Sequence, residues 1–332
     1  MFDQAALEMV CADQAFSGVV TAESGGVAVA VAVGSADRAN GRPNRLDTRF
    51  ATASMTKGFT AVAIVSLVES GDLTLGTRLR DLVGEDLPNV DPRVTIEALL
   101  GHRSGVGDYL DEELLDDIDE HVPGIPSAHS FETPDDYLPL VAAAPQVNPP
   151  GERFAYNNGG FIMLSVAIER ASGRGFHDIV RDRVFSPAGM TTAGFFRADD
   201  LPANTAIGYL RSGRSNVFHL PVVGGGDGGA YVTAADMTAF WEALFAGRLL
   251  SSDNVQMVTA HRSETNEEGH DYGLGFWLTT GGTAVVLEGM DAGVSCRSSY
   301  DPATGATYTV LANDSSCAWP IARHLETVIG AT

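Results

Sequence analysis

The order of apolar and polar positions predicts where helices and strands lie in the first part of the chain. Residues 3–14 have the spacing of a short amphipathic helix. Two valine-rich runs follow, at 16–21 and 27–33, and the turn-forming residues 23–26 separate them. Such runs on either side of a short glycine-containing turn are typical of a β-hairpin. Residues 36–49 are polar and predict a loop.

The next segment, residues 54–70, is apolar on nearly every side. Phe59, Ile64 and Leu67 fall on different faces of a helix with 3.6 residues per turn. A helix that is apolar all round is buried all round. Gly71 follows directly and is typical of the residue that ends a helix.

Residues 75–265 have the pattern of helices broken by loops rich in glycine and proline. The clearest helical segments are 94–100, 137–144, 161–172, 176–184 and 234–246. Thr233 and Asp236 have the spacing of a capping box before the last of these. Seven of the ten residues 111–120 are acidic, which predicts a solvated helix or loop.

Short strands return after residue 270, and a helix closes the chain. The strands are predicted at 274–280, 284–287, 294–300 and 308–312, and the helix at 321–329. Strands at both ends with helices between them predict an α+β fold, in which one antiparallel sheet is built from both termini and flanked by helices. We expect a discontinuous sheet domain of residues 1–74 and 266–332, and a mostly helical domain of residues 75–265.

Composition narrows the partners and the compartment. The 332 residues are 44% hydrophobic and 19% charged, which is typical of a folded protein. The formal net charge of −22 disfavours nucleic acid and anionic membranes as partners. There is no apolar run long enough to span a membrane, and the acidic start does not match a secretion signal. Cys11, Cys296 and Cys317 are too few for a disulfide framework or a zinc site. Free thiols are favoured over a Cys296–Cys317 bridge, so we expect a cytoplasmic protein.

The numbers of arginine and lysine residues indicate a candidate catalytic residue. The basic residues are 20 arginines and a single lysine, Lys57. Arginine supplies positive charge as well as lysine does, but it cannot give up its proton at a useful pH, whereas a buried lysine can. A lone lysine is either a matter of chance or the mark of a place that requires a neutral amine.

Ser54 lies three residues before this lysine, at the start of the apolar helix. Positions i and i+3 share one helix face, about one turn apart. A serine hydroxyl becomes a good nucleophile when a neighbouring base takes its proton, and burial gives lysine the lowered pKa that a base needs. The helix N-terminus favours an oxyanion and disfavours an ammonium. Ser54 and Lys57 are therefore candidates for nucleophile and general base.

These residues open a series of motifs that resembles the serine β-lactamase-related family. That family includes class C β-lactamases, D-Ala-D-Ala carboxypeptidases and family VIII carboxylesterases. The resemblance covers about residues 15–315. Its motifs are T-x-F and S-x-T-K at 48–57, L-L-x-H-x-S-G at 99–105, P-G-x-x-F-x-Y-x-N at 150–158, a P-L-G-M-like turn at 187–190, a segment before a late helix at 228–236, and a Y-G-L-G-W-like run at 272–277.

The resemblance implies roles for several residues. Ser54 would be the acylated nucleophile, with Lys57 as its base. Tyr156 would place its phenol beside both, sharing the role of base or passing a proton to the leaving group. Asn158 would direct its amide at the substrate or at Lys57. The resemblance also implies a β-lactamase/transpeptidase-like fold that needs no cofactor.

The chain departs from the family near its C-terminus. The family usually has Lys/His-x-Gly on a strand there, and the matching triplet is Leu287-Glu288-Gly289. Loss of the cation disfavours anionic substrates such as β-lactams. Gly289 would still allow close approach, and the backbone N–H of Met290 would pair with that of Ser54 as an oxyanion hole. We therefore expect a carboxylesterase that acts on small acyl esters.

Several alternatives stay open at this stage. A D-amino-acid peptidase, an amidase or a weak β-lactamase is the second interpretation within enzymes, with a small-molecule ester or amide as substrate in every case. A non-catalytic ligand-binding or sensor protein with the same fold is the interpretation from another class. His102 is either catalytic or, more in keeping with its loop, structural. No G-x-S-x-G motif occurs, which disfavours an α/β-hydrolase. The histidines lack the spacing of metal ligands, and the oligomeric state is left open.

Overall fold

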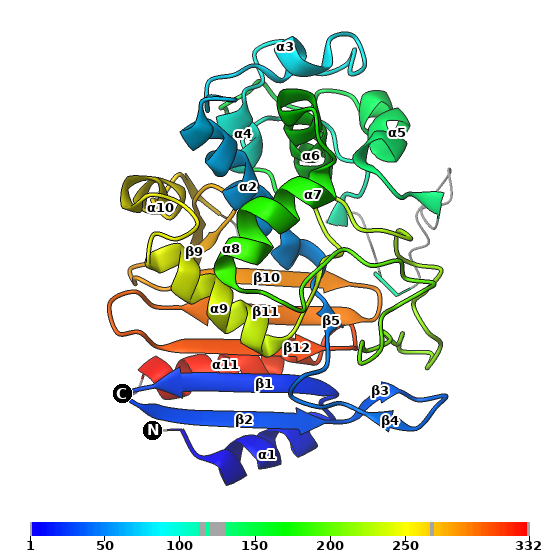
Figure 1. Cartoon of the computed structure of the whole chain (residues 1–332), viewed down its shortest axis with the longest axis vertical. Helices are drawn as coiled ribbons and strands as arrows, with labels where there is room; N and C mark the ends of the chain where they lie inside the picture. Colours follow the sequence, from blue (N-terminus) through cyan, green and yellow to red (C-terminus); the bar gives the residue numbers. More distant parts are fainter. Residues whose placement is uncertain (1, 113–116, 120–129, 266–268, 331–332) are drawn as a thin grey trace.

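A large antiparallel sheet forms the middle of the molecule (Figure 1). The computed structural model describes residues 2–112, 117–119, 130–265 and 269–330. Within them the sheet has the order β2-β1-β12-β11-β10-β9-β8-β7. Its strands are β1 (Gly18–Ser24), β2 (Val27–Val33), β7 (Ser263–Glu264), β8 (His270–Tyr272), β9 (Trp277–Thr279), β10 (Val285–Asp291), β11 (Val294–Tyr300) and β12 (Thr307–Ala312).

The sheet joins the two ends of the chain, as the sequence predicted. β1 pairs with β2 on one side and with β12 on the other, and Val19 lies opposite Leu311 in that second pairing. Helices α1 (Gln4–Asp13) and α11 (Ala318–Gly330) pack on β2 and β12 through an apolar cluster that includes Leu7, Val310 and Ile321. Helix α9 (Ala234–Phe245) also contacts β12 and β1, and Figure 1 shows it crossing the sheet on the side away from α11.

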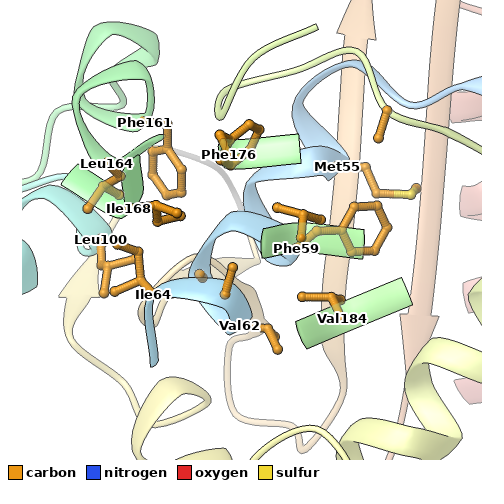
Figure 2. Close-up of a cluster of buried hydrophobic side chains, with 14 of the residues drawn as sticks. Met55, Phe59, Val62, Ile64, Leu100, Phe161, Leu164, Ile168, Phe176 and Val184 are labelled. Atoms are coloured by element: carbon orange, nitrogen blue, oxygen red, sulfur yellow. The ribbon is translucent and has the colours of Figure 1, made fainter. Parts of the chain in front are cut away.

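Helix α2 (Thr56–Ser70) runs through the core and is buried along most of its length. Every residue of 56–67 is buried, which confirms the prediction of a helix surrounded on all sides. Phe59 makes edge-to-face contacts with Phe185 and Phe240, with ring centroids 5.3 Å and 5.1 Å apart. Figure 2 shows Phe59 and Ile64 of this helix among apolar side chains that other helices supply. Gly71 ends it with a left-handed φ of 83°.

The remaining helices lie mostly on one side of the sheet (Figure 1). They are α3 (Leu79–Val83), α4 (Ile96–Leu100), α5 (Leu138–Ala143), α6 (Asn158–Ser172), α7 (Phe176–Val180), α8 (Ser186–Ala188) and α10 (Ser252–Val258). Short 3-10 turns η1 (Ala53–Met55) and η4 (Pro134–Tyr137) precede α2 and α5, and the π-helical turn η5 (Arg181–Phe185) follows α7. Helix α6, which is also largely buried, packs against α2, α3 and α4. It therefore joins this group of helices to the core.

The structure adds short strands that the sequence did not predict. The predicted loop 36–49 contains parts of a two-stranded ribbon, β3 (Ser35–Asp37) with β4 (Arg42–Pro43). A second small pair joins β5 (Phe50–Ala51) to β6 (Tyr231–Val232), just before the buried helix. The capping box of Thr233 and Asp236 is present at the start of α9, as predicted.

Some predictions concern residues that the structure describes only in part. Of the acidic run 111–120, the structure describes 111–112 and 117–119, and the prediction for the rest lies outside the described residues. The division into a sheet domain and a helical domain stays a prediction. All three cysteines are free thiols. Among the described helices, none is long and apolar enough to cross a membrane.

Candidate active site

Ser54 lies in the 3-10 turn η1, which leads directly into α2. The residue before it, Ala53, has a φ of 42°, in the left-handed region that a residue with a Cβ rarely adopts. Gly228 packs beside the backbone of Ala53. A Cβ added to Gly228 would make an ordinary van der Waals contact with Ala53. Backbone strain of this kind persists where the surrounding structure enforces it, often at functional sites. Ala53 and Ser54 both line a pocket.

The Lys57 amine reaches back along the helix to Ser54. Its Nζ lies 2.8 Å from the Ser54 Oγ, 2.7 Å from the Asn158 Oδ1 and 2.8 Å from the backbone oxygen of Asp227. The last two atoms are acceptors only, so each takes an N–H from the amine. A neutral amine has two such hydrogens and one lone pair. In that state the lone pair therefore faces the Ser54 hydroxyl.

Burial sets the protonation of Lys57. The side chain is 2% exposed, and desolvation lowers the pKa of its amine below the usual 10.5. Asp227, Glu112, Asp108 and Asp291 act in the opposite direction, because their negative charges favour the ammonium. The loss of solvent outweighs them, and the pKa of Lys57 is lowered overall.

Asn158 is fixed by the start of helix α6. Its backbone N–H and that of Gly159 donate to the Asp108 carboxylate at 2.6 Å and 2.8 Å. Its side-chain amide donates to the Leu110 oxygen and to the Glu112 carboxylate, both at 2.9 Å. Of the two orientations that the family resemblance implied, the structure shows the one in which the Asn158 oxygen faces Lys57. Burial raises the pKa of the Asp108 carboxyl to about 6.

Tyr156 comes to the same place from the loop before α6. Its phenol lies beside the Ser54 side chain, which lowers the pKa of the phenol slightly, and its ring centroid lies 4.9 Å from the Lys57 Nζ. The ring stacks on Trp277, with centroids 5.9 Å apart. Burial, with the charge of Glu112, raises the pKa of Tyr156 well above its usual value. The Tyr156 phenol therefore holds its proton more tightly than usual, whereas the Lys57 amine releases its proton more readily.

His102 packs against the loop that carries Tyr156 and forms hydrogen bonds with it. Its Nδ1 accepts the backbone N–H of Asn157, and its backbone oxygen accepts that of Ala155. Its ring lies among aromatic side chains, with the Tyr156 centroid 4.4 Å away. Burial lowers the pKa of His102 well below its usual value, so the imidazole is neutral. These contacts match the structural role expected for this histidine.

Strand β10 forms another wall of the site. A Cβ on Gly289 would lie 2.4 Å from the Thr52 oxygen and 2.6 Å from the Ser54 nitrogen, so only glycine permits this approach. Leu287 is 2% exposed and packs against Gly58 of α2. Glu288 forms an ion pair with Arg297 at 3.4 Å. Met290, the expected oxyanion-hole donor, is 38% exposed and lines the pocket.

The pocket beside Ser54 contains a feature that the sequence did not reveal. The carboxylates of Glu112, Asp227 and Asp291 all line it. Burial raises the pKa of Asp227 and raises that of Asp291 to about 7. In the sequence these residues fall in an acidic run, a glycine-rich loop and a turn, each of which has an ordinary structural explanation. No local signal joins them, because the fold alone brings them together.

A buried helix with serine and lysine one turn apart, set beside an antiparallel sheet, defines a protein of the penicillin-binding-protein-like β-lactamase fold. The family model described as Beta-lactamase matches residues 6–324. The chain belongs to this Beta-lactamase family.

Individual relatives agree with the family and differ in their activities. The crystal structure of a penicillin-binding protein from Bacillus halodurans is 40% identical, with a TM-score of 0.90 over 97% of this chain and 99% of that one. A D-aminopeptidase of Cereibacter sphaeroides is 33% identical over 68% of this chain and 41% of its own length. Esterase EstB of Burkholderia gladioli is 34% identical over 57% of this chain and 49% of its own length. The chain also spans less than two thirds of two penicillin-binding-protein relatives from Bacillus subtilis.

Proposed function

We propose that the chain is a serine hydrolase that forms an acyl-enzyme on Ser54, with small carboxylic esters as its substrates. The observation that carries the proposal is the 2.8 Å approach of the Lys57 Nζ to the Ser54 Oγ in a site that lowers the pKa of the amine. A nucleophile joined to a buried base is the arrangement that covalent catalysis requires. Membership of the Beta-lactamase family supports the same chemistry.

The protonation states assign the steps. The neutral Lys57 amine takes the Ser54 proton while the Ser54 Oγ bonds to the carbonyl carbon. The bond from that carbon to the leaving oxygen then breaks, and the leaving oxygen receives a proton from the Tyr156 phenol, which the Lys57 ammonium replaces. Water then attacks the acyl carbon while Lys57 takes its proton; the bond from that carbon to the Ser54 Oγ breaks, Lys57 returns the proton to Oγ, and the acid is released. In the proposal, the backbone N–H groups of Ser54 and Met290 stabilise the oxyanion, as Gly289 permits.

The choice of ester over β-lactam rests on charge. Among the described residues no arginine or lysine lines the pocket, and Leu287, at the position of the family's usual cation, is buried against Gly58. An anionic substrate would meet carboxylates in place of a positive charge. A neutral ester avoids this repulsion and also has a better leaving group than an amide.

A second candidate is hydrolysis of amides or peptides of D-amino acids. It is favoured by the carboxylates of Glu112, Asp227 and Asp291 in the pocket, which suit a free amino group. The D-aminopeptidase relative supports it as well.

A labelling experiment tests the proposal. A fluorophosphonate probe should attach to the wild-type chain and to Ser252→Ala, an exposed-serine control, but not to Ser54→Ala. No labelling of the wild type would contradict the nucleophile and favour a sensor, and labelling of Ser54→Ala would show that the reactive nucleophile is another residue. Rates on p-nitrophenyl acyl esters, nitrocefin and D-alanine amide then rank the substrates. We expect ester hydrolysis to dominate, and faster nitrocefin opening would overturn the preference.

A further inference from the structure

Asp227 lies in a loop that otherwise consists of glycine. Residues 224–229 are three glycines, Asp227 and two further glycines. The loop packs closely on the two buried helices. A Cβ on Gly226 would lie 2.3 Å from the Phe161 oxygen of α6, and the Thr60 hydroxyl of α2 donates to the Gly226 oxygen at 2.7 Å. Asp227, which lines the pocket, therefore carries the one side chain of this loop.

The same residue is joined directly to Lys57. Its backbone oxygen accepts an N–H from the Lys57 Nζ at 2.8 Å, and its carboxylate is only a few bonds away from that oxygen. The Tyr109 hydroxyl donates to the carboxylate at 2.6 Å, which fixes its orientation. Burial raises the pKa of the Asp227 carboxyl, whereas the charge of Lys57 and the hydrogen bond from Tyr109 lower it. The Asp227 anion is therefore favoured when Lys57 is charged.

Asp227 is the carboxylate most strongly coupled to this amine. Asp108 accepts N–H groups at the start of α6, and Glu112 accepts a side-chain amide. Asp291 accepts the N–H of the residue after it. Of these four carboxylates, which all favour the Lys57 ammonium, Asp227 has the largest effect and Asp291 the smallest.

A charge at this place matters because the proposed reaction makes a buried cation. When the neutral Lys57 amine takes the Ser54 proton, it becomes an ammonium on a side chain that is 2% exposed. Desolvation lowers the pKa of the amine, and a base whose pKa is too low accepts a proton poorly. A carboxylate close to the amine offsets part of the cost of desolvation.

We propose that Asp227 is the counter-charge of the Lys57 ammonium: its carboxylate stabilises the cation that forms when Lys57 takes the proton of Ser54. The proton leaves the Ser54 Oγ as that atom bonds to the acyl carbon, and the ammonium later passes a proton on, so the Asp227 carboxylate neither gains nor loses one. This inference rests on the proposed function and adds a positioning residue, because Asp227 acts through Lys57.

The single lysine makes this coupling measurable on the full chain. In untagged protein carrying ¹³C at lysine Cε, NMR gives the titration midpoint of Lys57 in the wild type and in Asp227→Asn, which keeps the shape of the side chain and removes its charge. We expect the midpoint to be at least about one pH unit lower in Asp227→Asn, since a nearby opposite charge shifts a pKa by this much. Asp227→Glu, which keeps the charge, should stay closer to the wild type. Equal midpoints in the wild type and Asp227→Asn, or the same fall in both variants, would overturn the counter-charge.

The pH dependence of hydrolysis is a readout that a merely structural role would not move. In Asp227→Asn the acidic limb of kcat/KM on p-nitrophenyl butyrate should move to lower pH with the Lys57 midpoint. Its plateau should fall about threefold to tenfold, because a weaker base takes the Ser54 proton. Glu23→Gln, which removes a charge from the exposed part of β1, should leave limb and plateau unchanged. A lower plateau with an unmoved limb would make the role of Asp227 structural and overturn the proposal.

Other titratable groups face the amine and stay in place in the variants at position 227. Within the described residues they are Asp108, Glu112, Asp291, the Tyr156 phenol and the neutral His102 imidazole. Asp291→Asn is the matched control, because it removes a charge from the same pocket with less effect on Lys57. Its midpoint should fall less than that of Asp227→Asn. An equal or larger fall would show that the total charge of the pocket, and not Asp227, acts on the amine.

The failure of one proposal can be distinguished from the failure of the other. If fluorophosphonate does not label the wild type but the Lys57 midpoint falls in Asp227→Asn, the hydrolase fails and the pairing of Asp227 with the ammonium stands. If Ser54 is labelled and the two midpoints agree, the counter-charge fails and the hydrolase stands.

Discussion

At the scale of single residues, the account depends on the nitrogen of Lys57. It lies within hydrogen-bonding distance of one hydroxyl and two oxygens that can only accept. An ammonium would satisfy all three with its own hydrogens, whereas a neutral amine satisfies two and accepts from Ser54. Both states fit the geometry, and the lowered pKa decides between them in favour of the amine as pH rises.

Replacement of Lys57 by arginine separates charge from basicity. Arg stays protonated at every useful pH, so Lys57→Arg should lose nearly all turnover, by about a thousandfold or more. Lys57→Met, which removes the charge from a site that is 2% exposed, should be equally inactive and remain folded. Initial rates on p-nitrophenyl butyrate together with circular dichroism measure both effects. A near-normal rate in Lys57→Arg would refute the neutral amine.

Asp291 should make stability depend on pH. Its pKa is about 7 in the folded protein and about 3.9 in an unfolded chain. Because the folded state holds this proton more tightly, its contribution to stability is complete below about pH 4 and is lost as pH rises through about 7. Burial is the main cause of the raised pKa of Asp291; the charges of Glu112 and Asp227 add to it, and Lys57 acts against it.

Asn cannot ionise, so Asp291→Asn should be more stable than the wild type, and more so at pH 8 than at pH 5. We expect the difference in unfolding free energy to grow by more than about 1 kcal/mol between these pH values, since each pKa unit corresponds to about 1.4 kcal/mol. Urea unfolding of both proteins at the two pH values measures it. An equal difference in unfolding free energy at pH 5 and pH 8 would show that burial does not raise the pKa of Asp291.

At the scale of elements, the sequence predicted long and uniform segments well. The buried helix of 54–70 and the hairpin at the N-terminus were predicted close to their observed bounds, because apolar periodicity dominates there. Strand β10 was predicted to end at Leu287 and extends to Asp291. Its polar end pairs with β11 and contacts η1. These are tertiary interactions, which the local sequence pattern does not predict.

The close contact between β10 and η1 gives a prediction for this level. In Gly289→Ala the new Cβ would lie under 3 Å from the Thr52 oxygen, the Ser54 nitrogen and the Met55 nitrogen, all backbone atoms. The variant should lose about 2 kcal/mol of stability or more and most of its activity. Gly76→Ala is the control, since its Cβ would meet only Thr74 at 3.9 Å. Thermal unfolding of the two variants compares them, and equal melting temperatures would contradict the contact.

The candidate site was predictable only where the residues follow one another closely. Ser54 and Lys57 lie one turn apart, so spacing alone placed them together. Tyr156 and Asn158 were expected from the family resemblance, because their own sequence indicates only a turn before a helix. Asp227 is brought to the pocket from a loop far along the chain, and its ordinary glycine-rich surroundings gave no reason to select it.

At the scale of the whole molecule, the formal charge of −22 acts against compactness. Among the described residues, nearly all ion pairs have at least one exposed partner, as in Arg45 with Asp47 and Arg181 with Asp178. Exposed pairs contribute little to stability, so the net repulsion should dominate the response to salt.

The melting temperature should therefore rise by a few degrees when sodium chloride is increased from about 0.02 M to about 0.5 M, because the Debye length falls well below the size of the protein. Differential scanning calorimetry at constant pH measures this. A falling melting temperature would show that attraction between the surface pairs outweighs the repulsion.

The central claim is that the Lys57 amine is neutral when it acts on Ser54, and the composition of the chain allows a direct measurement. Lys57 is the one lysine in the sequence. An untagged sample carrying ¹³C at lysine Cε therefore gives a single lysine signal, whose chemical shift reports the protonation of Nζ as pH is raised. The account predicts a midpoint clearly below the ordinary lysine value of 10.5. A midpoint at or above 10.5 would contradict it.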